Sequence, residues 1–183
     1  MLVLCLILLF SNSSFGQKHL NNYDATFKKY SKRFFGPGFD WKLFKAQGVA
    51  ESQLTPNAVS QVGARGIMQL MPSTFKEVQS KNPDFIAIEN PDWNIGAGIY
   101  YDRNLYTSWK EIEDGNEKLL FTFGSYNAGK RTIMKAQTKA KIDSLNHTSW
   151  ESISSVAHKV PKWRYKETLN YVERIKQYRV VIK

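Results

Sequence analysis

Residues 40–52 read Asp-Trp-Lys-Leu-Phe-Lys-Ala-Gln-Gly-Val-Ala-Glu-Ser, and this stretch decides the fold. Asp40 suits a helix N-cap, because its carboxylate can accept hydrogen bonds from the free N–H groups of the first turn. Apolar or small residues then recur at the three- and four-residue spacing of one helix face: Trp41, Phe44 and Gly48. Glu51 continues that face. The stretch therefore predicts a helix with a carboxylate at the C-terminal end of its core-facing side.

The sequence on both sides of this stretch predicts more helices. Aromatic residues recur at helical spacing over 22–35, and Gly36-Pro37-Gly38 would end that helix. Further helices are expected at 72–78, 94–106, 117–126, 130–141, 149–156 and 166–180. The composition of 54–66 and of 81–92 favours irregular loops. Because no β-branched alternation is long enough for a central sheet, we expect a mainly α fold, a compact bundle of about seven helices with at most a small β flap.

Length and charge indicate one domain with an anionic partner. A chain of 183 residues suits a single domain with its own core. It has 26 Lys and Arg against 16 Asp and Glu, and the formal net charge is +10. Such a charge favours nucleic acid, anionic lipid or an acidic cell wall, although scattered solvated lysines would give the same total.

The N-terminus predicts export. Residues 1–10 are almost wholly apolar and 11–14 are polar, which is the pattern of a signal peptide followed by its cleavage site. A membrane-spanning helix would need about 20 apolar residues. We expect a signal peptide at 1–16, an N-terminal helix and linker at 17–38, and the main domain at 39–183.

Two observations qualify the export prediction. No basic residue precedes Lys18, which is unusual for a signal peptide, and an apolar start of the fold itself is the alternative. Cys5, the only cysteine, lies within the expected signal, so the mature chain would hold neither a disulfide nor a thiolate nucleophile. After export, nucleic acid is no longer an expected partner.

Several common chemistries find no support in the sequence. His19, His147 and His158 lie in no metal-ligand spacing. Neither a Gly-x-Ser-x-Gly elbow, nor a P-loop, nor a Gly-x-Gly-x-x-Gly run occurs. We therefore expect no metal and no cofactor, and the chemistry is left to carboxylates.

Four segments carry a resemblance to a known family. They are Glu51-Ser52, Gly63-Ala64-Arg65-Gly66-Ile67-Met68-Gln69-Leu70-Met71-Pro72-Ser73-Thr74, Ser125-Tyr126-Asn127-Ala128-Gly129 and Glu167-Thr168-Leu169-Asn170-Tyr171-Val172. In this order they resemble the catalytic domain of soluble-lytic-transglycosylase (SLT) type enzymes of the lysozyme-like superfamily. The resemblance implies a lysozyme-like bundle around a glycan groove, with 39–183 as the catalytic domain.

The same resemblance implies that peptidoglycan is cut without water, which leaves a 1,6-anhydromuramic acid end. The chemistry agrees, because a glycosidic oxygen needs a proton as the bond breaks, and an acid that works near neutral pH needs a raised pKa. Apolar neighbours would raise the pKa of Glu51. The segments around Glu51 and Gln69 offer no second acid. We therefore expect Glu51 to act as acid and then as base, while the sugar's own acetamido group or C6 hydroxyl attacks.

The resemblance also implies substrate contacts for Ser60, Met68, Gln69, Met71, Tyr126, Asn127 and Glu167. Ser60 would hydrogen-bond the substrate near the reacting centre, although a turn cap would equally explain a serine there. Gln69 would bond sugar amides, and it needs a partner if it is buried. Met68 and Met71 would be flexible apolar walls, but each could equally belong to the core.

The last three of these residues follow in two later segments. Tyr126 would reach the catalytic carboxyl or the sugar with its hydroxyl, and Asn127 would lie in the turn that presents it. Glu167 corresponds to a family glutamate deep in the groove that orients the substrate. A surface carboxylate on a basic helix is the alternative reading of Glu167.

Three rivals to a lytic transglycosylase remain open at this point. One is a hydrolytic muramidase of the same fold, a second is a non-catalytic wall-binding module, and a third is a charge-driven binder of membranes or nucleic acid. We expect a monomer that is exported to the periplasm or cell envelope. Its expected partners are peptidoglycan glycan strands and no nucleic acid, with peripheral association to the wall or the membrane surface.

Overall fold

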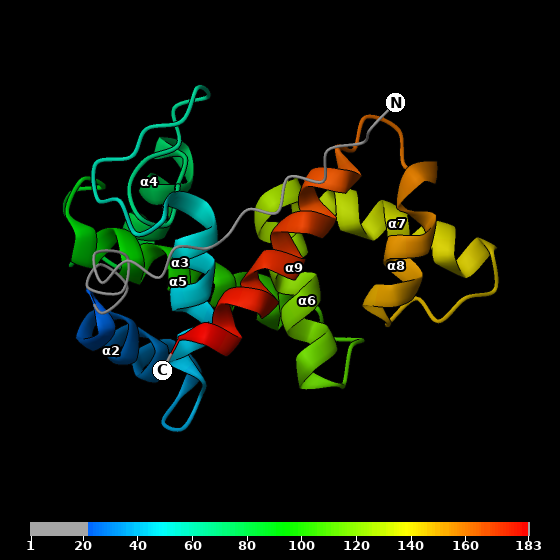
Figure 1. Cartoon of the computed structure of the whole chain (residues 1–183), viewed down its shortest axis with the longest axis horizontal. Coiled ribbons are helices and arrows are strands. Elements are labelled where there is room, and N and C mark those ends of the chain that lie inside the picture. Colours follow the sequence, from blue (N-terminus) through cyan, green and yellow to red (C-terminus); the bar gives the residue numbers. More distant parts are fainter. Residues whose placement is uncertain (1–21, 183) are drawn as a thin grey trace, which may run out of the picture.

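A computed structural model describes residues 22–182 and shows a helical bundle (Figure 1). Its α-helices are α2 (Asp24–Phe35), α3 (Trp41–Ser52), α4 (Pro72–Lys81), α5 (Pro91–Ser108), α6 (Gly115–Ala128), α7 (Lys130–Ile142), α8 (Trp150–Val156) and α9 (Tyr165–Val181), and a short 3₁₀ helix, η1 (Ala157–Lys159), follows α8. The mainly α fold expected from the sequence is confirmed. The expected signal peptide at 1–16, with Cys5, lies outside the described residues and stays a prediction.

Helix α3 begins and ends as the sequence indicates. The Asp40 carboxylate accepts a hydrogen bond from the backbone N–H of Lys42 at 3.2 Å, so Asp40 is the N-cap. After Ser52 the backbone enters the left-handed region, with φ of 55° at Gln53 and 59° at Leu54. This abrupt end leaves Glu51 in the last turn of the helix.

Two helices begin earlier than expected, because their caps were missed. The Asn90 side chain accepts from the backbone N–H groups of Asp92 and Trp93, and Pro91 occupies the first turn of α5. Proline in the segment 81–92 favoured a loop, but this proline starts a helix. In the same way Asp114 caps α6, so that helix begins at Gly115 rather than at 117.

Helix α9 lies between two groups of helices and packs on both α3 and α6 (Figure 1). On the α3 side, α2 packs against α3 and α5, and α4 packs against α5. On the other side, α7 packs against α6, and α8 packs against α7. One core joins them, with buried side chains from α2, α3, α5, α6 and α9: Phe27, Phe44, Ile95, Phe121 and Tyr171. The expected N-terminal helix thus shares the core of the main domain.

The expected β flap is reduced to isolated β-bridges in the loop between α3 and α4. Among the described residues, isolated antiparallel bridges pair Arg65 with Val59 and with Leu70, and no longer strand forms. Gly66 has a φ of 75°, and a Cβ atom there would lie 2.4 Å from Nδ2 of Asn94. Only glycine therefore lets the loop approach α5 this closely.

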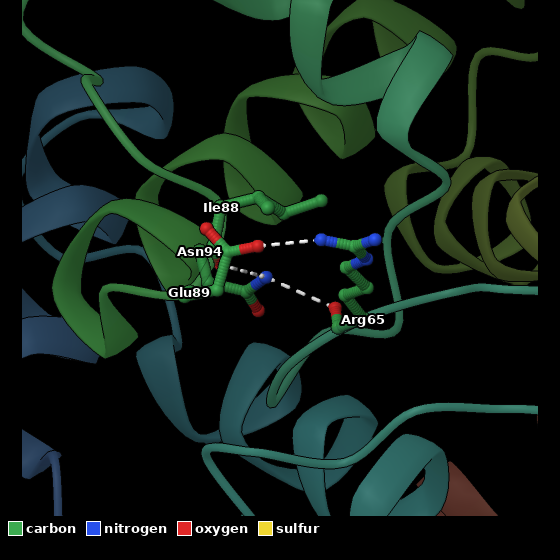
Figure 2. A network of polar contacts seen from close by, with 4 residues as sticks. All are labelled: Arg65, Ile88, Glu89 and Asn94. Carbon is green, nitrogen blue, oxygen red and sulfur yellow. Dashed lines mark hydrogen bonds and ion pairs between the residues drawn. The ribbon is translucent and has the colours of Figure 1, made fainter.

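Asn94 of α5 holds this loop in place (Figure 2). It is 1% exposed, and its Oδ1 accepts from the backbone N–H of Met68 at 2.8 Å. Its Nδ2 donates to the carbonyls of Arg65 and Ile88, each at 3.0 Å. Nearer the surface, the Arg65 guanidinium pairs with Glu89 at 2.6 Å. One side chain thus satisfies three backbone groups of two irregular segments.

Replacing Asn94 with alanine is expected to destabilise the fold by at least about 2 kcal/mol, because buried backbone groups would lose their partners. Urea unfolding monitored by circular dichroism measures this. Asn104→Ala is the matched control, since Asn104 is exposed on the same helix. Equal unfolding midpoints for the two variants would contradict the anchoring role of Asn94.

Candidate active site

Glu51 lies in the last turn of α3, where the loop, α9 and α6 converge. Its carboxyl is partly buried, and Oε1 accepts a hydrogen bond from the Tyr171 hydroxyl of α9 at 2.6 Å. The neighbouring Ser52 hydroxyl donates to the carbonyl of Ile67 at 2.8 Å, which fastens the end of α3 to the loop. The catalytic candidate is therefore fixed by contacts that join distant parts of the chain.

Burial raises the pKa of Glu51 from 4.5 to about 7. The hydrogen bond from Tyr171 and the positive charge of Arg174 act in the opposite direction and lower it. Because burial dominates, a large fraction of Glu51 carries a proton near neutral pH. A carboxylic acid in this state can donate a proton and, once ionised, can take one back.

Tyr171 lies in the last of the four segments that carry the family resemblance, but no role was expected for it from the sequence. It is buried on α9, in a stripe with the spacing of one helix face: Thr168, Tyr171, Val172 and Ile175. Burial raises its pKa well above the usual value, and the nearby Glu51 raises it further, so the hydroxyl keeps its proton and donates. A tyrosine on a buried stripe needs an acceptor for its hydroxyl, and that signal could have identified it.

Tyr126 lies next to this site, but its hydroxyl is used differently from the expectation. It donates to the carbonyl of Met68 at 2.7 Å, and its ring meets that of Tyr101 edge-on with centroids 5.3 Å apart. The hydroxyl that reaches the Glu51 carboxyl is that of Tyr171. The expected role of Tyr126 at the carboxyl is corrected accordingly, because its own α6 position directs it to the loop backbone.

The two methionines differ in exposure. Met68 is 0% exposed and packs where a side chain on Gly98 would clash, so it belongs to the core and cannot touch a sugar in this structure. The core alternative for Met68 is thus the one that the structure supports, and the expected substrate contact is corrected. Met71 is 40% exposed at the start of α4 and is available as an apolar wall.

Ser60 and Gln69 both stabilise the loop. The Ser60 hydroxyl accepts from the backbone N–H of Ala64 at 3.0 Å, which is the turn-cap geometry. Gln69 has a φ of 45°, and its Nε2 donates to the carbonyls of Gly66 at 2.9 Å and Ala58 at 3.3 Å. These contacts supply the partner that a half-buried glutamine requires.

Asn127 and Glu167 come together in a hollow of about 230 Å³. The Asn127 Oδ1 accepts from the Thr168 hydroxyl at 2.8 Å. Glu167 is exposed and forms an ion pair with Arg164 at 2.8 Å, so it does not lie deep in a groove as expected. Glu51 does not line this hollow. Helix α9 contributes a residue both to this hollow and to the Glu51 carboxyl. Glu167 precedes Tyr171 by four residues and lies on the neighbouring turn of the helix.

A second carboxyl lies behind Glu51 and was missed in the sequence. Asp102 of α5 is fully buried, accepts a hydrogen bond from Gln47 of α3 at 3.3 Å, and interacts electrostatically with Glu51. The signal was an acid on the buried stripe of α5: Ile95, Ile99, Asp102 and Leu105.

Over residues 22–182 no group of three or more His, Cys, Asp or Glu side chains is arranged to hold a metal ion. In the same part of the chain no helix is both long enough and apolar enough to cross a membrane.

Known proteins share this fold and sequence pattern. The chain is 31% identical over 176 residues to membrane-bound lytic murein transglycosylase F of Photobacterium profundum, a match that covers 88% of this chain and 32% of that protein. The corresponding protein of Desulfosudis oleivorans is 32% identical over 158 residues, which cover 80% of this chain and 34% of the relative. The chain therefore spans about a third of the length of these curated relatives.

Two solved structures are similar as well. An inactive glutamate-to-glutamine mutant of lytic transglycosylase Slt from Pseudomonas aeruginosa superposes with a TM-score of 0.68 at 25% identity, over 88% of this chain and 24% of that one. The 70 kDa soluble lytic transglycosylase of Escherichia coli superposes with a TM-score of 0.63 at 25% identity, over 86% of this chain and 23% of that one.

The model of one protein family matches most of the described chain. It is the Transglycosylase SLT domain, and the match covers residues 25–148, which include Glu51, the loop between α3 and α4, and Tyr126. Since this is more than half of the sequence, the chain belongs to the Transglycosylase SLT domain family.

Proposed function

We propose that this chain is a peptidoglycan lytic transglycosylase domain that cleaves the bond between N-acetylmuramic acid and N-acetylglucosamine and leaves 1,6-anhydromuramic acid ends. The observation that carries the proposal is the partly buried Glu51, whose pKa is about 7 and whose carboxyl is held by Tyr171. The named activity of the relatives and of the similar structures supports it.

In the first step, protonated Glu51 donates its proton to the glycosidic oxygen as the bond from the anomeric carbon breaks. The raised pKa keeps the proton available near neutral pH. The carboxylate that remains is stabilised by the hydrogen bond from Tyr171, which favours the ionised form.

In the second step, the C6 hydroxyl of the same muramic acid attacks the anomeric carbon. A new bond joins C1 to O6, and the hydroxyl proton goes to the Glu51 carboxylate, which returns to its starting state. Because the attacking oxygen belongs to the same sugar, its proximity supplies acceleration that a water molecule would lack.

The position of Asp102 supports a single-acid mechanism. Glycosidases that use two carboxylates place both of them at the scissile bond. Asp102 has no exposed surface, so it touches neither a sugar nor an attacking water. A hydrolytic muramidase with one acid would use the same geometry, and the mass of the product distinguishes it, because the anhydro product is lighter by one water.

Exposed Met71 and the loop residues Ser60 and Gln69 would contact the glycan on one side of Glu51, and Asn127 and Glu167 would do so where the end of α6 meets α9. The net charge of +10 suits an acidic wall. We place the protein in the cell envelope as a monomer with peripheral association to the wall or membrane surface, in keeping with the membrane-bound relatives.

Replacing Glu51 with glutamine is expected to lower the release of anhydromuropeptides from purified sacculi at least about 100-fold, because the amide keeps the shape but loses the proton. Mass spectrometry of the soluble products measures it. Glu151→Gln, at an exposed glutamate of α8, is the control and should act like the wild type. Undiminished release by the Glu51 variant would favour a binding module or another acid, and hydrated products from the wild type would indicate a muramidase.

The same substitution is expected to change the pH dependence of stability. The folded-state pKa of Glu51, about 7, is above its unfolded value of 4.5, so its contribution is present below pH 4.5 and is lost as the pH rises toward 7. Relative to wild type, Glu51→Gln should therefore gain up to about 3 kcal/mol between pH 4.5 and pH 8. Denaturant unfolding at both pH values measures this, and parallel stability–pH curves would contradict the raised pKa.

Replacing Tyr171 with phenylalanine is expected to raise the pKa of Glu51, because the hydroxyl stabilises the ionised carboxylate. The alkaline limb of the pH–activity profile should move to higher pH, and kcat at its optimum should fall. Tyr178→Phe removes a hydroxyl from the same helix and should leave the limb in place. A limb that stays fixed, or that moves to lower pH, would exclude this role of Tyr171.

A further inference from the structure

The buried pair Asp102 and Gln47 has no role in the proposed reaction. Both side chains are 0% exposed, and they connect α5 to α3. Gln47 precedes Glu51 by four residues, so it lies one turn below the catalytic carboxyl on the same face of α3. The pair therefore lies buried in the core, one turn of α3 away from Glu51.

One hydrogen bond joins the two side chains, and each of them has one further oxygen atom without a partner. Nε2 of Gln47 donates to Oδ1 of Asp102 at 3.3 Å. Oδ2 of Asp102 and Oε1 of Gln47 are both buried and have no partner. If Asp102 were ionised, both orphan atoms would be acceptors and could not bond each other. A proton on Oδ2 turns that oxygen into a donor, so that a single hydrogen bond from Oδ2 to Oε1 would satisfy both unpaired atoms.

The surroundings of Asp102 do not stabilise a negative charge. Glu51 of α3, Tyr126 of α6, Tyr171 of α9 and Tyr101 of its own helix are the titratable groups within its electrostatic reach. In the part of the chain that the structure describes, no lysine or arginine forms an ion pair with it. Burial first and the Glu51 charge second raise the pKa of Asp102 well above its usual value, against the lowering effect of Gln47.

We propose that Asp102 is an uncharged carboxylic acid in a reciprocal acid–amide pair with Gln47, and that it acts as a positioning residue for Glu51. The pair ties the turn of α3 below Glu51 to α5 and adds no charge to the site. This role rests on the proposed function, in which Glu51 must ionise and then recover its proton. A second negative charge behind Glu51 would oppose that ionisation.

The charge state can be tested without any activity assay. Infrared spectra of protein labelled with ¹³C-aspartate should show the carbonyl band of a protonated carboxylic acid at pH 8, and Asp102→Asn should remove it. Asp92→Asn, at an exposed aspartate of the same helix, should leave the band unchanged. Absence of the band from the wild type at pH 8 would overturn the neutral acid, whatever reaction the protein catalyses.

The positioning role is tested by two substitutions with similar shape. Asp102→Asn keeps a reciprocal pair with Gln47, so kcat and the alkaline limb of the pH profile should match the wild type. Asp102→Leu cannot hydrogen-bond, and it should lower kcat at least about tenfold with little change in KM, because Glu51 is misplaced while the substrate contacts remain. Equal kcat for the Leu and Asn variants would overturn the positioning role.

A shift of the alkaline limb to lower pH in Asp102→Asn would overturn the neutral state, because it would mean that the substitution removed a negative charge next to Glu51. If instead Glu51→Gln keeps full activity while the infrared band is present, the proposed function fails and the neutral Asp102 stands. The two proposals therefore fail separately.

Discussion

The hydrogen bond from Tyr171 to Glu51 is the contact on which the site depends, because it joins the end of α3 to the middle of α9. Helix α9 packs on both α3 and α6, so the position of Tyr171 is set by the whole bundle (Figure 1). Burial raises the pKa of Glu51 and this hydrogen bond lowers it. Their balance leaves a carboxyl that holds a proton near neutral pH and tolerates its loss, which is what an acid that later acts as a base requires.

The loop beside Glu51 is irregular but held on several sides. The backbone N–H of Met68 donates to Asn94 of α5, and its carbonyl accepts from Tyr126 of α6. The carbonyl of the preceding residue, Ile67, accepts from the Ser52 hydroxyl at the end of α3. An irregular backbone near a buried carboxyl needs such partners, because no strand ladder satisfies its polar groups. The same contacts explain why the Tyr126 hydroxyl bonds the loop rather than the Glu51 carboxyl and why Met68 is in the core. The proposed Asp102–Gln47 pair would add a support from below.

Local features of the sequence were predictable where short-range rules apply. The N-cap at Asp40 and the placement of Glu51 at the end of a helix follow from spacings of three and four residues and from capping. The start of α5 was misjudged, because a proline suits both a loop and a first helical turn, and only the cap at Asn90 decides between them. Glu167 was expected deep in the groove, but it lies on the exposed side of α9, where it pairs with Arg164.

The sequence by itself determined the mainly α fold, the family and the candidate acid, because helical periodicity and short motifs are properties of neighbouring residues. Only the tertiary structure decided which groups act on that acid. Tyr171 lies 120 residues from Glu51, and Asp102 is brought beneath it from another helix. Burial, hydrogen bonding and charge at a carboxyl depend on distances between elements, and those distances arise when side chains from all the helices pack into one core.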